Sequence, residues 1–457
     1  MAEPLRLEGG TTSIQAKGEP PSISESDVLS LFPDTAGVTG DGHLELDGVD
    51  LVGLAAEFGT PLYVYDEATI RGRARAYRGG LEAAYPGESL VCYAGKAYCA
   101  PWLLQIIADE GLGLDVVSGG ELFAAQSVGF PPERIFFHGS NKAEHELMQA
   151  LEVGVGRVVV DNFEEMERLS ELCGQQGTRQ TVLLRVAPSV EAHTHAHIQT
   201  GVLDTKFGLS IQTGAAAEGV RRIRGARNLE LEGLHAHIGS QVFELEPYRQ
   251  TIERIFEFAA SVGLALRELS PGGGYGVRYT AADTLVEPAK SSRAVAQAVC
   301  AAAAAANAEL PRLTIEPGRS IVGPAGVALY RVGSIKAIPR VRTYVAVDGG
   351  MADNIRPTAY GAVYTPVLAN RISQRADTVV AIAGRYCESG DVLVRSASLP
   401  MPVVGDLVAI PASGAYQLSM ASNYNLVPRP AAVVVASGQT RLVRRRETYA
   451  DLFAAEA

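Results

Sequence analysis

The sequence predicts an α/β protein made of a TIM-type (β/α)8 barrel followed by a mainly β C-terminal domain. From about residue 90, eight β-rich runs alternate with segments long enough to form a helix. Beyond about residue 325, helical periodicity becomes scarce and short β runs separated by turns take over. Repeated βα units in this number are typical of a closed barrel rather than an open sheet. The expected barrel strands are Leu90–Tyr93, Gly113–Val117, Arg134–Phe137, Arg157–Val160, Thr181–Val186, Leu231–His237, Ala265–Leu269 and Arg312–Ile315.

The expected β domain draws on both ends of the chain. The early run Pro61–Tyr65 precedes the first barrel strand and could add a strand to the C-terminal domain, which would make the barrel an insertion. We therefore expect a disordered or loosely attached segment at 1–28, strands contributing to the β domain at 29–65, the barrel at 66–325 and the β domain at 326–457. The later strands are expected at Val327–Ile338, Thr343–Val347, Thr378–Ala383, Leu407–Ile410 and Ala432–Ala436.

Composition narrows the possible partners and location. The 457 residues carry 40 basic and 51 acidic side chains, for a net charge of −11, which argues against nucleic acid or an anionic membrane as a general partner. Five cysteines without paired spacing favour a reducing cytoplasm. The N-terminus lacks a signal-peptide pattern, and the longest apolar run, Ala294–Ala306, is too short to cross a bilayer. We expect a cytoplasmic protein without a membrane or nucleic-acid partner.

Three motifs stand where barrel strands should end. Lys96 closes an apolar run, Gly272–Gly274 form a glycine-rich turn, and Glu316-Pro-Gly-Arg319 follows the last barrel strand. An amine, an anion-binding loop and a paired carboxylate and guanidinium are the groups that hold pyridoxal phosphate as a Schiff base. Alone, each could be a surface lysine, a plain turn or a structural ion pair. Together, at the end of a barrel where active sites form, they predict a site for this cofactor.

Histidines supply two further candidates. His237, in His235-Ala-His237-Ile-Gly-Ser240, is placed to stack on a flat ring, and Ser240 is free to bind phosphate; a satisfied core histidine is the competing interpretation. The segment His193-Thr-His195-Ala-His197 suggests a metal cluster, but no acidic or sulfur ligand is nearby in sequence. We expect this segment to be a loop bordering the site and predict no metal.

The β domain adds further polar candidates. Cys387 beside Glu388 is either an acid–base thiol or one more inert, buried cysteine. Arg356, in Arg356-Pro-Thr-Ala-Tyr360, offers a guanidinium suited to a carboxylate. Tyr416 and the polar run Ser419–Asn425 are unusual for a plain strand, and Asn425 is expected to be structural.

These motifs together resemble the PLP-dependent family of ornithine, diaminopimelate and arginine decarboxylases, which has an alanine-racemase-type barrel. The resemblance spans about residues 40–453. Gly95 and Tyr98 depart from the usual Leu and Asn around the lysine, and Pro271 precedes the glycines, but no catalytic group is lost. The matching motifs are Tyr-Ala-x-Lys96-Ala, Asp115-Val-Val-Ser-Gly-Gly-Glu121, Lys206-Phe-Gly208, His237-Ile-Gly-Ser-Gln241, Gly-Gly-Gly274, Glu316-Pro-Gly-Arg319, Asp348-Gly-Gly-Met351, Cys387-Glu-Ser389 and Ser419–Asn425.

The resemblance also implies a role for each residue. Lys96, His237 and Cys387 would be catalytic, with Cys387 donating a proton from the second subunit of a homodimer with shared sites. Pyridoxal 5'-phosphate would be bound by Lys96, His237, Ser240, Gly274, Glu316, Gly318, Arg319 and Tyr416. The amino-acid substrate would be bound by Arg319, Arg356, Tyr360, Glu388 and Tyr416.

The implied reaction is decarboxylation of meso-2,6-diaminopimelate to L-lysine and CO2, the last step of lysine biosynthesis. Arg356, Tyr360 and Glu388 suit a substrate with a second amino-acid end, which D-ornithine and D-lysine lack. A decarboxylase of such another amino acid remains the main alternative, and a racemase is disfavoured by the Cys387 and Arg356 motifs. A non-catalytic PLP-binding regulator is the second alternative, although it should have lost Lys96 or Cys387.

Overall fold

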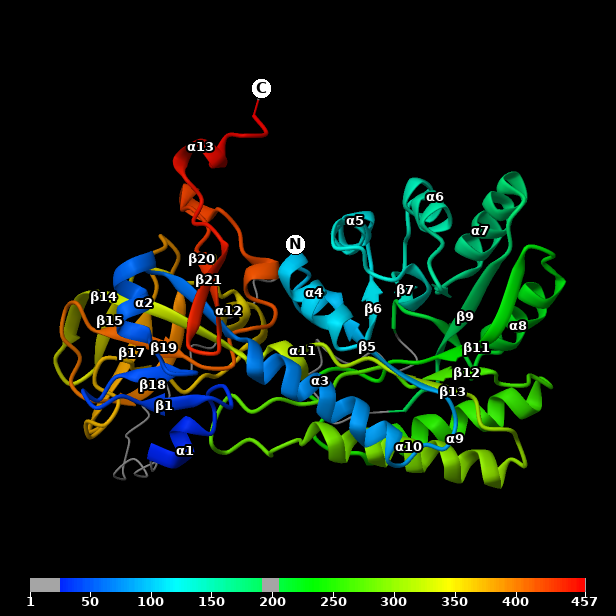
Figure 1. Ribbon diagram of the computed structural model, residues 1–457, viewed down its shortest axis with the longest axis horizontal. Helices are drawn as coiled ribbons and strands as arrows, with labels where there is room; N and C mark the ends of the chain where they lie inside the picture. The colour runs from blue at the N-terminus through cyan, green and yellow to red at the C-terminus, as the bar shows by residue number, and fades with distance from the viewer. Residues whose placement is uncertain (1–24, 191–204, 457) are drawn as a thin grey trace, which may run out of the picture.

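The computed structural model describes residues 25–190 and 205–456. One domain is a barrel of eight parallel strands, in which the pairings of β8 with β9 and of β13 with β5 close the ring. Figure 1 shows this barrel beside the β domain. The predicted fold class is therefore confirmed. The barrel strands are β5 (Ser89–Ala94), β6 (Gly113–Val116), β7 (Ile135–Phe137), β8 (Arg157–Val160), β9 (Gln180–Ala187), β11 (Leu229–His235), β12 (Glu268–Ser270) and β13 (Arg312–Ile315). The short strand β10 (Leu209–Ser210) pairs in parallel with the C-terminal end of β9.

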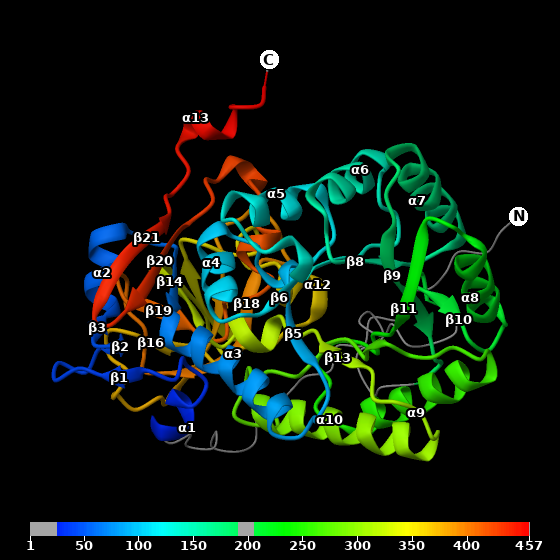
Figure 2. The ribbon, with the colours of Figure 1, turned by 45° about the vertical axis from the view of Figure 1, so that its right-hand side comes forward.

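Helices cover the outside of the barrel (Figures 1 and 2). Ser118 and Asn162 cap two of them by accepting a backbone N–H three residues later, which satisfies an otherwise free donor. The longer helices are α3 (Glu67–Glu82), α4 (Pro101–Asp109), α5 (Gly119–Ser127), α6 (Glu144–Val153), α7 (Phe163–Gln176), α8 (Ala215–Gly225), α9 (Glu246–Ser261) and α10 (Pro288–Ala305). In the described residues no helix is long and apolar enough to cross a membrane.

The β domain is organised around the long strand β14 (Gly326–Ile338). It pairs with β15 (Arg342–Val347), with β19 (Leu407–Ile410) and, across more than 250 positions of sequence, with β4 (Leu62–Asp66). The sheet order is β18-β17-β15-β14-β4-β20-β21. Its other strands are β16 (Val367–Leu368), β17 (Thr378–Ala383), β18 (Val392–Leu399), β20 (Ala431–Ala436) and β21 (Gln439–Arg444).

The chain before β4 packs on this domain. A three-stranded sheet of β1 (Ala36–Val38), β2 (Leu44–Leu46) and β3 (Val49–Asp50) leads into α2 (Leu51–Phe58). Buried leucines of these elements share a hydrophobic core with β4 and β14. Residues 25–29 form the short helix α1, so part of the segment expected to be loosely attached has regular structure.

Several strand ends differ by one to three residues from the sequence prediction, and the structure gives the reason for two of them. β11 ends at His235 rather than His237, because its ladders to β9 and β12 stop there. β12 begins at Glu268 rather than Ala265, since its partners on β11 start at Gly233. Both differences concern where pairing stops, which the apolar pattern does not mark. His237 consequently lies in the loop beyond the strand, above the barrel.

Candidate active site

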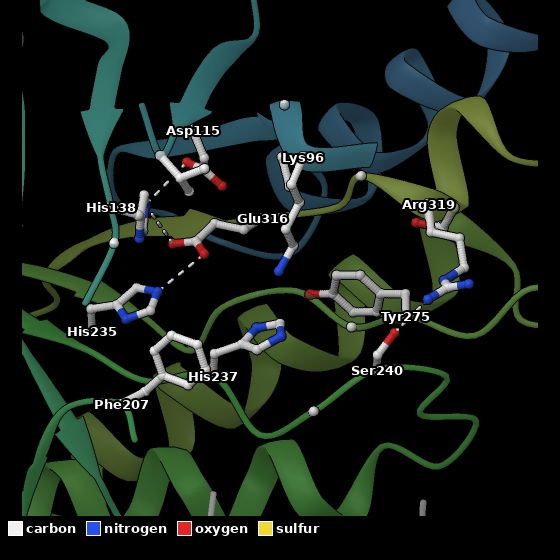
Figure 3. Close-up of a pocket in the computed structure, with 18 of the residues that line it drawn as sticks. Lys96, Asp115, His138, Phe207, His235, His237, Ser240, Tyr275, Glu316 and Arg319 are labelled. Atoms are coloured by element: carbon white, nitrogen blue, oxygen red, sulfur yellow. Dashed lines mark hydrogen bonds and ion pairs between the residues drawn. The ribbon is translucent and has the colours of Figure 1, made fainter. Parts of the chain in front are cut away.

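The barrel encloses a pocket at the C-terminal ends of its strands (Figure 3). Of the site residues expected from the sequence, eight line this pocket together, although they come from five separate regions of the chain. They are Lys96, His237, Ser240, Gly274, Glu316, Gly318, Arg319 and Tyr416.

Lys96 reaches the pocket from the short turn Gly95–Ala97, directly after β5. A Cβ at Gly95 would lie 2.8 Å from the backbone oxygen of Asp115, so a side chain there would push β5 and β6 apart. The Lys96 side chain extends into the pocket (Figure 3). An amine delivered this way can reach a small molecule held in the barrel mouth.

Glu316 is a buried carboxylate at the end of β13. His235 Nε2 lies 3.1 Å from its Oε2, and Ser270 donates its hydroxyl to Oε1 at 2.5 Å. Burial alone would raise the pKa of Glu316, but His235, His138 and these hydrogen bonds hold it well below its usual range. Within the described residues Glu316 contacts no lysine or arginine. A buried anion without a cationic partner is costly, so this position suits a protonated ring nitrogen.

Arg319 does not pair with Glu316, which removes the interpretation of the motif as a structural ion pair. Its guanidinium donates to Ser240 Oγ at 2.8 Å and to Tyr279 Oη at 2.9 Å, and it lies 4.6 Å from the centre of the Tyr416 ring. Ser240 and Arg319 thus bring a hydroxyl and a cation to the same wall of the pocket. These are the donors that a phosphate group requires.

The glycine loop brings three strand ends into direct backbone contact beside this wall. A Cβ at Gly273 would lie 1.9 Å from the backbone oxygen of Glu316. At Gly274, where φ is +97°, it would lie 2.1 Å from the backbone oxygen of Gly239. Only glycine allows this approach, and exposed backbone in such a turn can bind an anion. The pocket residues therefore fit the phosphate, the ring nitrogen and the aldehyde of pyridoxal phosphate.

His237 lines the pocket as an uncharged ring. Burial, with Lys96 nearby, lowers its pKa well below the ordinary value. Gly273 donates its backbone N–H to His237 Nδ1 at 3.2 Å, which fixes the ring orientation. The histidine is therefore hydrogen-bonded, as a core histidine would be, and also presents its ring to the pocket.

Several pocket residues were not expected from the sequence as site residues. Asp115 and His138 lie on the same side as Glu316, with His138 Nε2 3.4 Å from Asp115 Oδ1 and 4.0 Å from Glu316 Oε1. Arg185 and Phe207 also line the pocket, with the Arg185 guanidinium 4.4 Å from the centre of the Phe207 ring. Asp115 and Phe207 belong to quoted motifs, and His138 follows a predicted strand; Arg185 lies within a predicted strand and carries no local signal.

Arg356 lies outside the pocket lining but is connected to it. This residue, on α12 (Arg356–Tyr360), is 5% exposed. Its Nη1 donates to Tyr364 Oη at 2.7 Å, and its guanidinium lies 4.5 Å from the centre of the Tyr279 ring. The two cations Arg319 and Arg356 hold the pKa of Tyr279 below its usual value although burial raises it. Among the described residues no carboxylate pairs with Arg356.

The remaining predicted substrate residues are exposed and do not line this chain's pocket. Cys387, Glu388 and Tyr360 are all solvent-accessible. The loop that carries Cys387 is nevertheless held in place, because Asn425 Oδ1 accepts the Cys387 N–H at 3.1 Å. Asp391 accepts backbone N–H groups from both Tyr386 and Met351. The histidines at 193, 195 and 197 lie outside the described residues.

Comparison with known proteins agrees with this geometry. Residues 67–323 match the family model for the pyridoxal-binding domain of pyridoxal-dependent decarboxylases. The diaminopimelate decarboxylase of Bacillus subtilis is 47% identical over 415 residues, 90% of this chain and 94% of that protein. The enzyme of the same name from Mycobacterium tuberculosis is 42% identical over 428 residues, 91% of this chain and 95% of that protein.

Solved structures show the same relationship. A crystal structure of diaminopimelate decarboxylase from M. jannaschii superposes with a TM-score of 0.87 at 33% identity, covering 93% of this chain and 98% of that one. The same enzyme in complex with L-lysine superposes with a TM-score of 0.86 at 34% identity, with the same coverage.

The chain belongs to the pyridoxal-dependent decarboxylases, and its cofactor is pyridoxal 5'-phosphate. The four relatives described above, which match over about nine tenths or more of this chain, are all diaminopimelate decarboxylases.

Proposed function

We propose that this chain converts meso-2,6-diaminopimelate to L-lysine and CO2, the last step of lysine biosynthesis. The main support for the proposal is the pocket itself, which Lys96, the buried Glu316 and the Ser240–Arg319 wall line together; in the described structure no lysine or arginine forms an ion pair with Glu316. When bound there, pyridoxal phosphate supplies an electron sink for the electron pair that departing CO2 leaves behind. We place the reaction in the cytoplasm, which the five unpaired cysteines support.

The barrel residues hold and tune the cofactor. Lys96 would be the covalent anchor, and Glu316 would accept the ring N–H and keep the nitrogen protonated. His237, whose ring is fixed by the Gly273 N–H, would stack on the cofactor ring. The phosphate would be bound by Ser240, Gly274, Gly318, Arg319 and Tyr416.

The distal end of the substrate is bound at the boundary between barrel and β domain. Arg319, Arg356 and Tyr360 hold its carboxylate, and Glu388 holds its ammonium group. Arg356 supports this assignment because it is a buried cation for which the described part of the chain offers no acidic partner. D-Ornithine has no second carboxylate and would leave that cation unpaired, which disfavours the alternative substrate.

Cys387 donates the proton that replaces the lost carboxylate, and it does so in the partner's pocket. On its own chain the thiol is exposed and does not line the pocket. The active unit is therefore a homodimer with two shared sites, in which each chain supplies one Lys96 and one Cys387. Asn425 and Asp391 keep the Cys387 loop in a defined position for this contact.

Subunit complementation tests the shared site. We expect Lys96→Ala to be inactive and Cys387→Ala to lose about 100-fold in kcat, since general acid catalysis contributes about that much. After the two variants are mixed and allowed to exchange subunits, half of the dimers are mixed. Each mixed dimer has one intact site, so about a quarter of the wild-type activity should return. Mixing Lys96→Ala with wild type under the same conditions controls for dilution.

No recovery by dimers shown to have exchanged subunits would place Cys387 in the pocket of its own chain. Full activity in a proven monomer would contradict the shared site in the same way.

A further inference from the structure

We propose that His235 and Ser270 are positioning residues that hold the Glu316 carboxylate in place for the ring nitrogen of pyridoxal phosphate. This inference rests on the proposed role of Glu316. Neither residue would contact the ring nitrogen, because both side chains are hydrogen-bonded to the Glu316 carboxylate and would act through it.

Three adjacent strands place these groups together. His235 is the last residue of β11, Ser270 is the last residue of β12, and Glu316 directly follows β13. The strands are neighbours in the barrel and run parallel, so their C-terminal ends meet at one edge. Each carboxylate oxygen receives one side-chain partner: His235 Nε2 at Oε2 and Ser270 Oγ at Oε1. Groups on strand ends are positioned more rigidly than groups on loops.

His235 holds Glu316 as an uncharged donor. The side chain is 1% exposed, and its Nδ1 has no hydrogen-bond partner in the described structure. Burial lowers the pKa of His235 to about 4, so at neutral pH the ring carries one proton. Because Nε2 faces the Glu316 carboxylate, a proton on Nε2 forms a hydrogen bond with that carboxylate, whereas a proton on Nδ1 would have no acceptor in the described structure. A neutral donor orients Glu316 without cancelling the charge that the ring nitrogen requires.

Ser270 connects Glu316 to the glycine loop. Its hydroxyl donates to Glu316 and accepts the Gly272 N–H at 3.2 Å. One fully buried side chain therefore sets the carboxylate relative to the loop that flanks the phosphate position. Ser270 thereby restrains the distance between the Glu316 carboxylate and the glycine loop.

Binding of a metal ion is the alternative role for the group formed by His138, His235 and Glu316. The ligand atoms of His138, His235 and Glu316 lie within 4.8 Å of one another. An ion would need the lone pair of His235 Nε2, and the proton would move to Nδ1. A metal-bound histidine normally donates its other N–H to an acceptor, and His235 Nδ1 has none in the described structure. The geometry favours the hydrogen bond to Glu316.

The test compares variants of His235 with a matched control in the same barrel. His235→Leu removes the donor, and His235→Gln keeps an N–H near the position of Nε2. Thr314→Val is the control. Thr314 lies on β13, two residues before Glu316, and its hydroxyl donates at 3.0 Å to another buried carboxylate, that of Glu268 on β12. The Kd of pyridoxal phosphate for the cofactor-free protein is measured by equilibrium dialysis. Turnover of diaminopimelate by the loaded protein gives kcat and KM.

We expect His235→Leu to raise the Kd about 10- to 100-fold, the range for one lost hydrogen bond to a charged group. Its kcat should fall about tenfold or more, with KM changed by no more than about twofold, because the substrate is held by other residues. His235→Gln should restore both values to within about threefold of wild type. An unchanged Kd and kcat in His235→Leu, or a loss no larger than that of Thr314→Val, would overturn the proposal.

Repeating the measurement in a Glu316→Gln background shows whether His235 acts through Glu316. Glu316→Gln alone should raise the Kd, and adding His235→Leu should then change it by less than about threefold, since coupled residues are not additive. An equal loss in both backgrounds would assign His235 a separate role and overturn the inference. A wild-type Kd and kcat in Glu316→Gln alone would instead refute the proposed role of Glu316.

Discussion

Replacing Lys96 with alanine is expected to lower kcat for diaminopimelate by at least about ten-thousandfold. Loss of a residue that acts covalently removes the whole reaction route rather than one contact. The same change should abolish covalent capture of the cofactor. Borohydride reduction in the presence of pyridoxal phosphate, followed by intact-protein mass measurement, checks this: wild type gains one pyridoxyl group per chain and the variant gains none.

Lys290→Ala provides the control for this experiment, because Lys290 is exposed on α10, outside the barrel. This variant should be labelled and active like wild type. Labelling of Lys96→Ala at another lysine, together with retained activity, would assign the anchor elsewhere. Lys206 would then be examined first, because it adjoins Phe207, which lines the pocket.

Replacing Arg356 with methionine is expected to lower kcat/KM for diaminopimelate about a thousandfold. Losing one partner of a buried, charge-assisted pair costs about 4 kcal/mol, and each 1.4 kcal/mol is a factor of ten. Most of the loss should appear in KM, since the contact lies far from the reacting carbon. Arg356→Lys keeps the charge but not the bidentate geometry, so its loss should be intermediate.

The fold should tolerate Arg356→Met, so its thermal midpoint distinguishes a loss of substrate binding from a loss of structure. Arg356 is 5% exposed and no described carboxylate pairs with it, so methionine removes a buried charge that only the Tyr364 hydrogen bond and the Tyr279 ring stabilise. We expect the thermal midpoint of Arg356→Met to be at least equal to that of wild type. Near-normal kinetics with diaminopimelate would show that Arg356 does not select the second carboxylate.

The sequence predicted the parts of the fold that depend on apolar patterning. All eight barrel strands were found because each is a short, buried run, and β4 was found because Pro61–Tyr65 is one as well. The strands β16, β18 and β21 were missed. β16 has only two residues, and β18 and β21 carry polar side chains on their exposed faces. Polar residues within these strands interrupt the apolar runs on which the prediction depended.

The site was predictable where its chemistry is carried by local motifs. Lys96, the glycine loop and Glu316 were recognised because each motif combines a reactive group with a strand end. Tyr279, Tyr364 and Ser270 were not, since each becomes important only through a partner that folding brings to it. Cys387 is a different case, because the group it is proposed to reach belongs to another chain. No pattern within one chain records that contact.

The most direct test of the account is product release by the purified, PLP-loaded protein. Meso-diaminopimelate and D-ornithine are offered separately, and CO2 and the amine product are measured for each. We expect lysine and CO2 in equal amounts from diaminopimelate, with little turnover of D-ornithine. Preferential turnover of D-ornithine would keep the fold and cofactor but contradict the assigned substrate and the roles of Arg356 and Glu388.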